Sequence, residues 1–171
     1  QAGIRRVMAQ HLGEILPAME AGMAVEGGIG IPVMNEAAAR KLLENIQGFT
    51  WSAELSFKEL ERLSFYNEGA CVVYGHIPVM LTEQCPAKEG GYCGKAPENS
   101  LALTDRMGEK WPIERHCRDC YNVFYLNRTI WLAGRPSWLR ALPGGKLRMY
   151  FTREDGERTR RVVEIYRGVL E

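Results

Sequence analysis

The sequence predicts an α/β fold built on a parallel sheet and interrupted by a β-rich region that carries four cysteines. Short apolar runs alternate with helical periods through the first half of the 171-residue chain. Glycine, proline and charged residues dominate from Thr82 to about Ser100, and a strand followed by an amphipathic helix ends the sequence. Strands that alternate with helices are typical of βαβ units, in a sheet that is either open or closed.

The first units of this sheet lie before residue 50. A strand, a short helix and a second, glycine-interrupted strand region follow one another at 4–10, 12–22 and 23–34. Asn35 is suited to be a helix N-cap, because its side-chain oxygen can accept a bond from a free N–H of the first turn. Residues 36–47 then place apolar side chains on one face and an acidic residue in the first turn, which predicts an amphipathic helix.

Two further strands complete this part of the chain. FTWSAEL, 49–55, predicts a third strand, and the S-x-x-E spacing of Ser56 and Glu59 predicts a capping box for a helix over 57–65. ACVVYGHIPVML, 70–81, predicts a single fourth strand. Beyond it we expect short strands of an antiparallel or irregular region, and then a last strand and helix, at 101–105, 110–114, 123–133, 146–152 and 154–170. The domains we expect are βα units at 1–82, a cysteine-containing insertion at 83–145 and a final strand–helix unit at 146–171.

Composition limits the functions to consider. Lysine and arginine together number 22 against 21 acidic residues, so no net field attracts nucleic acid or a membrane to the whole chain. No apolar run reaches the roughly 18 residues of a membrane helix, and no signal peptide is evident, which favours the cytoplasm. The chain starts at Gln1 almost directly on a strand, so we expect it to be a piece of a longer protein.

Four of the five cysteines form a candidate metal site. Cys85 and Cys93 have seven residues between them, and after a further 23 residues Cys117 and Cys120 have the C-x2-C spacing that turns two thiolates toward one ion. A set of four thiolates suits zinc or an iron–sulfur cluster, and the spacing does not separate them. Unligated thiols are the alternative. Cys71, in an apolar run, is predicted to be a buried, inert thiol. Candidate hydrogen-bond donors to the thiolates are Tyr121, Asn122 and Asn127.

Polar residues that follow the predicted strands are the catalytic candidates, because reactive loops of parallel sheets lie at the carboxyl ends of the strands. They are His11, Asn35, Glu54, Tyr74 and His76. Glu54 has the chemistry of a general acid or base, although a role in the turn explains it equally well. His76 follows a glycine and precedes a proline in a constrained segment that can aim it into a pocket; a solvent-facing ring is the alternative.

Arginines interleaved with tryptophans would suit stacking and phosphate contacts with RNA, although an ordinary loop-rich surface has the same composition. They are Arg118, Arg128, Arg135 and Arg140, with Trp131 and Trp138. The basic run at 158–161 lies on the last predicted helix, where a solvated face is the simplest interpretation.

Five stretches taken in order resemble the carboxyl-terminal half of the collagenase-like bacterial peptidases, a family of unassigned catalytic type. They are IPVMNEAAARKLL, FTWSAELSFKELERL, VVYGHIPVMLTEQCP, LTDRMGEKWPIERHC and CYNVFYLNRTIWL, and the similarity runs from about Ala9 to Glu171. The resemblance implies the later βα units of a (β/α) barrel of the TIM type, with the cysteine segment at its catalytic face. It also implies a hydrolase that is part of a larger bacterial enzyme.

Some members of that family resemble iron–sulfur proteins that assist hydroxylation of RNA bases or of a quinone precursor, with four cysteines holding a [4Fe–4S] cluster. By this similarity Cys85, Cys93 and Cys117 match the family's cysteine positions, and Cys120 is the fourth candidate ligand. Where the family's strand often carries an acidic residue and a histidine, this chain has Ala70 and Tyr74, which disfavours hydrolysis by that pair.

Several partners follow from these interpretations. A peptidase implies a protein or peptide substrate, and the cluster alternative implies RNA. A structural metal or RNA-binding module, with zinc in the site, is a further alternative. We expect no membrane contact. A partial barrel would expose strand edges, so we expect self-association through a sheet edge or contact with the rest of a longer chain.

Overall fold

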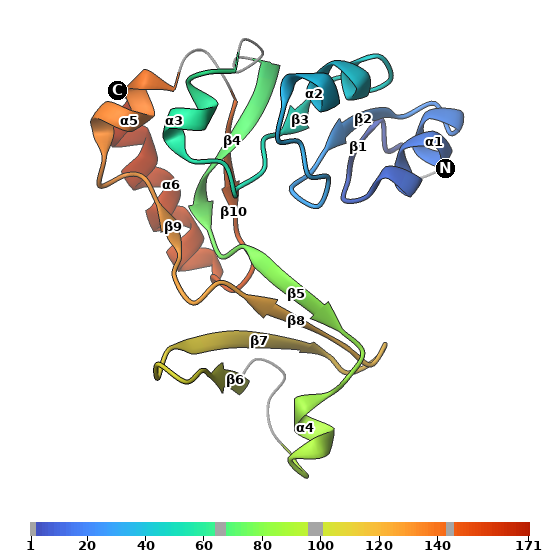
Figure 1. The fold of residues 1–171 in the computed structure, drawn as a ribbon, viewed down its shortest axis with the longest axis vertical. Coiled ribbons are helices and arrows are strands. Elements are labelled where there is room, and N and C mark those ends of the chain that lie inside the picture. Colours follow the sequence, from blue (N-terminus) through green and yellow to red (C-terminus); the bar gives the residue numbers. More distant parts are fainter. Residues whose placement is uncertain (1–2, 64–67, 96–100, 143–145) are drawn as a thin grey trace. The chain divides into compact units, whose positions relative to one another are not determined.

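The computed structural model describes residues 3–63, 68–95, 101–142 and 146–171 (Figure 1). The chain divides into two compact units. Unit 1 comprises residues 1–73, 132–149 and 161–171, and unit 2 comprises residues 74–131 and 150–160. Helices and strands mix along the chain, which confirms the α/β class. The strands of the described segments form one two-stranded and two four-stranded sheets, none of which closes into a barrel.

Unit 1 begins with a parallel strand pair. Strand β1 (Arg6–Ala9) pairs with β2 (Ala24–Gly27), and the 3-10 turn η1 (Leu12–Glu14) and helix α1 (Ile15–Glu20) connect them. Helix α2 (Glu36–Leu43) follows, and the side chain of Asn35 accepts a bond from Ala38 N at 2.9 Å. The predicted N-cap is therefore confirmed, and the helix ends four residues before the predicted position.

The larger sheet of unit 1 is centred on β4. Strand β3 (Phe49–Thr50) runs parallel to β4 (Gly69–Gly75), and β10 (Leu147–Tyr150) lies on the other side of β4. Between β3 and β4, Ser56 and Glu59 form the predicted capping box at the start of α3 (Phe57–Leu60). Positions 64 and 65 of the predicted helix lie outside the described residues. The core here includes six larger apolar side chains that are at most 3% exposed: Ile31, Val33, Phe49, Trp51, Val73 and Tyr166.

Helix α6 (Gly156–Leu170) confirms the predicted carboxyl-terminal helix. Its part in unit 1 buries Val162 and Tyr166. Helix α5 (Pro136–Ala141), which the sequence analysis did not predict, carries Trp138, whose ring stacks on Phe57 at a centroid distance of 4.9 Å. No helix in the described part of the chain is both long and apolar enough to cross a membrane.

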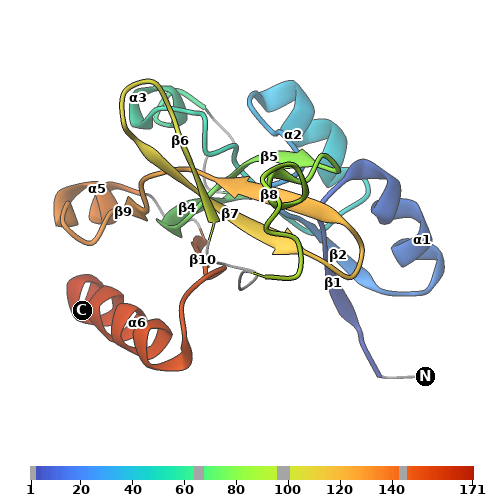
Figure 2. The ribbon, with the colours of Figure 1, turned by 90° about the horizontal axis from the view of Figure 1, so that it is seen from below.

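Unit 2 is built on an antiparallel sheet, in agreement with the character predicted for this region (Figure 2). Its strands, in spatial order, are β5 (Pro78–Thr82), β8 (Tyr121–Tyr125), β7 (Lys110–His116) and β6 (Leu101–Thr104). The short helix α4 (Pro86–Glu89) follows β5, and β9 (Ile130–Trp131) pairs with Tyr74 and Gly75.

The prediction of one strand over 70–81 is wrong. The segment forms two strands that belong to different sheets, β4 and β5. The break lies at Gly75, whose φ of +133° is accessible to glycine and strained for other residues. The stretch predicted as a strand over 123–133 likewise divides into β8 and β9.

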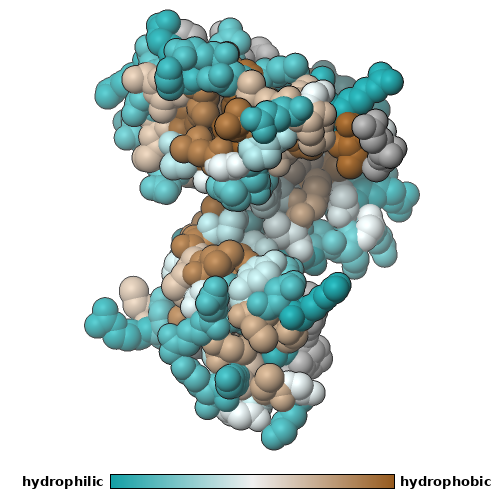
Figure 3. Space-filling model, turned by 90° about the vertical axis from the view of Figure 1, so that its right-hand side faces the viewer, coloured by the Kyte–Doolittle hydropathy of each residue, from teal (hydrophilic) through white to brown (hydrophobic). Residues whose placement is uncertain are grey.

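Strand β5 is one edge of the antiparallel sheet, and its side chains are largely exposed. Val79, Met80 and Leu81 expose 50%, 47% and 68% of their surfaces. Hydrophobic residues also form part of the molecular surface on the face drawn in Figure 3. Apolar edge strands are the usual sites of strand pairing between chains. Self-association through this edge stays a prediction.

Candidate functional site

The C-x2-C pair lies in the turn between β7 and β8. His116, the last residue of β7, pairs with Tyr121, the first residue of β8, so Cys117 and Cys120 belong to the four-residue turn between them. Asp119 N donates to His116 O at 3.2 Å within this turn. Cys120 has a φ of +56°, and its Sγ lies 3.8 Å from Cys117 O. The hairpin register therefore presents both thiols at one end of the sheet.

The other pair flanks α4. Cys85 directly precedes the helix, and Cys93 follows it, between two glycines with positive φ, Gly91 and Gly94. Asn122, only 1% exposed on β8, donates through Nδ2 to Thr82 O at 3.3 Å and to Gln84 O at 3.2 Å. This amide thus holds the segment before Cys85 against the strand that follows Cys120.

The hydrogen bonds of Asn122 and Asn127 correct the expectation that their amides serve the thiolates. Asn122 Nδ2 donates to two backbone carbonyls, and Asn127 Nδ2 donates to Glu109 Oε2 at 2.8 Å. The ring of Tyr121 stacks on His116 at a centroid distance of 4.2 Å. These side chains organise the hairpin and the segment before Cys85.

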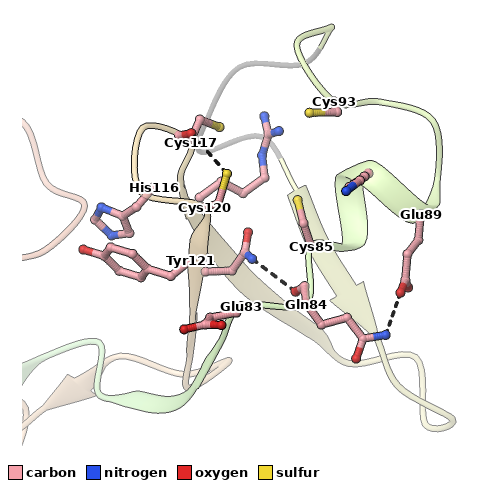
Figure 4. Close-up of a pocket in the computed structure, with 12 residues that line it drawn as sticks. Glu83, Gln84, Cys85, Glu89, Cys93, His116, Cys117, Cys120 and Tyr121 are labelled. Carbon is pink, nitrogen blue, oxygen red and sulfur yellow. Dashed lines mark hydrogen bonds between the residues drawn. The ribbon is translucent and has the colours of Figure 1, made fainter.

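All four cysteines line one cavity of about 560 Å³ within unit 2. Figure 4 shows them around the same space, with the sulfur atoms of Cys85, Cys93 and Cys120 directed into it. Cys85 is half-buried and the other three are exposed. Arg115, 2% exposed on β7, also lines the cavity and brings a positive charge to it. The four cysteines thus line the same cavity, and their binding of a metal or cluster stays a prediction.

The cavity is wider than the site of a single ion. Among the residues that the structure describes, no three His, Cys, Asp or Glu side chains lie close enough together to hold one metal ion. Zinc bound by cysteine needs each sulfur about 2.3 Å from the ion. The four thiols therefore line a cavity and do not converge on the position of a single ion.

His76 has hydrogen-bond partners on both ring nitrogens. Nδ1 lies 3.2 Å from Leu126 O, and Nε2 lies 2.8 Å from Thr129 Oγ1. Because a carbonyl oxygen only accepts, the proton of the neutral ring is on Nδ1, and Nε2 accepts from the Thr129 hydroxyl. Thr129 is 53 residues from His76 along the chain and belongs to no recognisable motif, so no signal in the sequence pointed to it.

A second, polar cavity of about 220 Å³ lies beside His76 in unit 2, lined also by Arg153, Glu154 and Arg158. Tyr74, only 1% exposed, donates its hydroxyl to Glu154 Oε1 at 2.8 Å, while Thr152 N and Arg153 N donate to Oε2 at 3.0 and 3.1 Å.

These contacts shift the pKa values of Glu154 and Tyr74. Partial burial opposes ionisation of Glu154, but the hydroxyl of Tyr74 and the backbone N–H groups outweigh it and hold the pKa of this carboxyl below its usual value. Burial, with the bond to Glu154, raises the pKa of Tyr74 to about 12. Glu154 is therefore ionised and Tyr74 neutral at neutral pH.

The remaining strand-end candidates have local structural partners or lie at the surface. Glu54 is exposed in unit 1, whereas His76 belongs to unit 2. His11 Nε2 lies 3.0 Å from Glu14 Oε1, and Asn35 caps α2. Cys71 is buried in β4, as predicted, and burial raises the pKa of its thiol to about 11, which disfavours the reactive thiolate.

Comparisons with known proteins identify no relative of this chain. No protein-family model matches the sequence, no curated protein matches it, and no solved structure matches the fold. The fold and the site together define the chain as an α/β protein whose antiparallel sheet carries a cysteine-lined cavity.

Proposed function

We propose that this chain is an iron–sulfur protein domain whose unit 2 holds a cluster on Cys85, Cys93, Cys117 and Cys120. The observation that carries the proposal is that these cysteines, from two segments 23 residues apart, line one cavity of about 560 Å³. All four donors are sulfur, the ligand type that iron–sulfur clusters take.

A cavity of about 560 Å³ has room for a cluster, which is larger than a single zinc ion. A cluster contains several iron and sulfide ions, so its cysteine ligands lie further apart than the ligands of one tetrahedral ion. Ligand sulfurs at the wall of a wider space suit the larger cofactor.

The surrounding side chains have complementary roles. The buried guanidinium of Arg115 offsets the negative charge that thiolate ligands bring into the cavity. Asn122 holds the Cys85 segment beside the hairpin turn, so the two halves of the site are joined before any cofactor binds. A bound cluster would supply one-electron transfer.

The resemblance to the collagenase-like peptidases extends this proposal. In the extended proposal, the α/β sheets of the chain are later units of a (β/α) barrel in a longer bacterial protein. The cluster would assist hydroxylation of RNA bases or of a quinone precursor. The exposed side chains of Arg118 and Arg128 in unit 2 would then contact an RNA substrate.

The test is the metal content of protein purified without oxygen. We expect iron and sulfide in equal amounts, a brown colour, and loss of both in the Cys85→Ser, Cys93→Ser double variant. Cys71→Ala is the matched control, because this fifth cysteine is buried in β4 outside the cavity and its replacement should leave the iron content unchanged. Stoichiometric zinc, no metal, or iron retained in the double variant would contradict the proposal.

A second candidate function, peptide hydrolysis, is favoured by the Thr129–His76 pair. A hydroxyl hydrogen-bonded to a histidine, whose other nitrogen is oriented by a third group, is the arrangement of an activated nucleophile. Here the third group is Leu126 O. As Thr129 Oγ1 attacked a peptide carbonyl, its proton would pass to His76 Nε2.

Hydrolysis of a fluorogenic peptide mixture tests this candidate. We expect Thr129→Val to lower the rate about 100-fold or more, since it removes the hydroxyl and keeps the shape. Thr129→Ser, which keeps a hydroxyl, should retain most of the activity. Equal rates in the wild type and in Thr129→Val would exclude Thr129 as the nucleophile.

A further inference from the structure

Arg115 is a charged side chain in the buried part of the wall of the cysteine-lined cavity. Only 2% of its surface is exposed. It lies on β7, two residues before Cys117, and lines the cavity together with the four cysteines. Burial of a charge is costly unless opposite charge lies near it. A buried cation beside a cavity therefore favours a negatively charged occupant.

The register of the sheet places Arg115 between the two halves of the cysteine site. Arg115 on β7 pairs with Asn122 on β8, and the side chains of directly opposed residues lie on the same face of a sheet. Asn122 holds Thr82 O and Gln84 O just before Cys85. Arg115 thus belongs to the part of the wall that joins the hairpin turn to the Cys85 segment.

The lysine and the two carboxylates of the same lining are at the surface. Glu83, Lys88 and Glu89 line the cavity and are exposed. Water and salt screen exposed charges, whereas a buried charge acts through a medium of lower dielectric constant. Arg115 therefore has a stronger effect than these three residues on a charge inside the cavity. The effect acts through space, so it does not depend on how many N–H groups of Arg115 already have partners.

The redox chemistry of a cluster is sensitive to such a charge. Reduction adds one electron to a centre that thiolate ligands already make negative. A fixed positive charge stabilises the reduced form more than the oxidised form, because the reduced form carries one more negative charge. The charge around a cluster is one of the factors that set its reduction potential. A buried arginine at the site raises that potential, so a weaker electron donor suffices for reduction.

We propose that Arg115 raises the reduction potential of the cluster held by Cys85, Cys93, Cys117 and Cys120. The inference rests on the proposed function and adds to it a residue that does not itself bind iron. In the reduction, one electron passes from an external one-electron donor to the cluster, and no bond of Arg115 forms or breaks. Arg115 acts only through its charge.

A redox titration of the anaerobically purified chain, followed by electron paramagnetic resonance, tests the inference. We expect Arg115→Gln to lower the ratio of reduced to oxidised cluster at least tenfold at the same solution potential, which is a midpoint potential about 59 mV lower. Arg115→Lys keeps the charge and should retain most of the wild-type potential. Lys88→Gln is the matched control: it removes an exposed positive charge from the same lining and should change the ratio by less than about twofold.

A second neutral variant, Arg115→Met, accompanies Arg115→Gln. Circular dichroism and iron content show which variants fold and bind the cluster. Iron kept by Arg115→Lys and lost by both neutral variants would support the proposal, because the positive charge would then be what holds the negative cluster. An unchanged potential in a neutral variant that keeps its cluster, an equal shift in Lys88→Gln, or loss of iron from all three Arg115 variants would overturn it.

The wild type separates this inference from the proposed function. A wild-type chain without iron and sulfide would overturn both. A wild-type cluster whose potential does not depend on Arg115 would overturn only the role of Arg115 and leave the cluster in place.

Discussion

Replacing Tyr166 with phenylalanine should lower the free energy of unfolding by about 1 to 3 kcal/mol. This tyrosine of α6 is fully buried, and its hydroxyl joins three backbone groups of unit 1. It donates to Val73 O at 2.5 Å and accepts from Leu132 N at 2.9 Å and from Ala133 N at 3.1 Å. Removing the hydroxyl leaves Ala133 N without this partner in a dry interior, which costs about 1 to 3 kcal/mol. Val73 O and Leu132 N keep a hydrogen bond to each other at 3.1 Å, so they are not left unsatisfied.

Urea unfolding followed by circular dichroism and tryptophan fluorescence measures this effect. Because the chain has two compact units, the loss should appear in the transition that reports unit 1. Tyr92→Phe is the matched control: Tyr92 is 57% exposed, so the same chemical change should alter stability by less than about 0.5 kcal/mol. A Tyr166→Phe variant as stable as the wild type would show that the hydroxyl does not bridge these backbone groups.

Gly75→Ala should lower the stability of the folded chain by about 3 kcal/mol or more, and the loss should arise in unit 2. Gly75 has a φ of +133°, a conformation that strains an alanine. A Cβ there would also lie 2.2 Å from Tyr150 O and 2.8 Å from Tyr150 Cβ. Both the strain and the overlap are properties of the folded state, so they reduce the free energy of unfolding directly.

Gly108→Ala separates these two causes. Gly108 also has a positive φ, +81°, but a Cβ there would have no atom within 4 Å. Its replacement should cost only the backbone strain, about 1 to 2 kcal/mol. Thermal or urea unfolding of both variants gives the comparison. If the two substitutions were equally costly, the close approach of Gly75 to Tyr150 would not be a feature of the folded protein.

Local signals in the sequence predicted local structure well. Asn35 and the Ser56–Glu59 pair form the caps that their spacing predicts, because a cap needs only residues within one helical turn. The helix at the carboxyl end, α6, begins two residues after the predicted start and ends at the predicted residue. The apolar periodicity of this segment was enough to predict the helix, because an amphipathic helix buries one face whichever partner covers it.

Residues far apart in the sequence decided the structure at the positions where local sequence patterns predicted it wrongly. The apolar run over 70–81 has the periodicity of one strand, yet the chain breaks at Gly75, which Tyr150 approaches from 75 residues away. Thr129 contacts His76, and Arg158 lines one cavity with it, only because the fold brings these distant residues together. In the sequence, Arg158 is one charge of a basic run for which a solvated face is the simplest interpretation.

The cysteine site combines both kinds of information. The residue types and the C-x2-C spacing, which are properties of the sequence itself, determined that soft sulfur ligands are clustered along this chain. Only the tertiary structure decided how wide the site is and what surrounds it. The register of β5, β8 and β7 carries Cys85 and the hairpin turn to one cavity and buries Arg115 in its wall. Spacing constrains only neighbours along the chain, whereas strand pairing sets the distances between segments that are far apart in sequence.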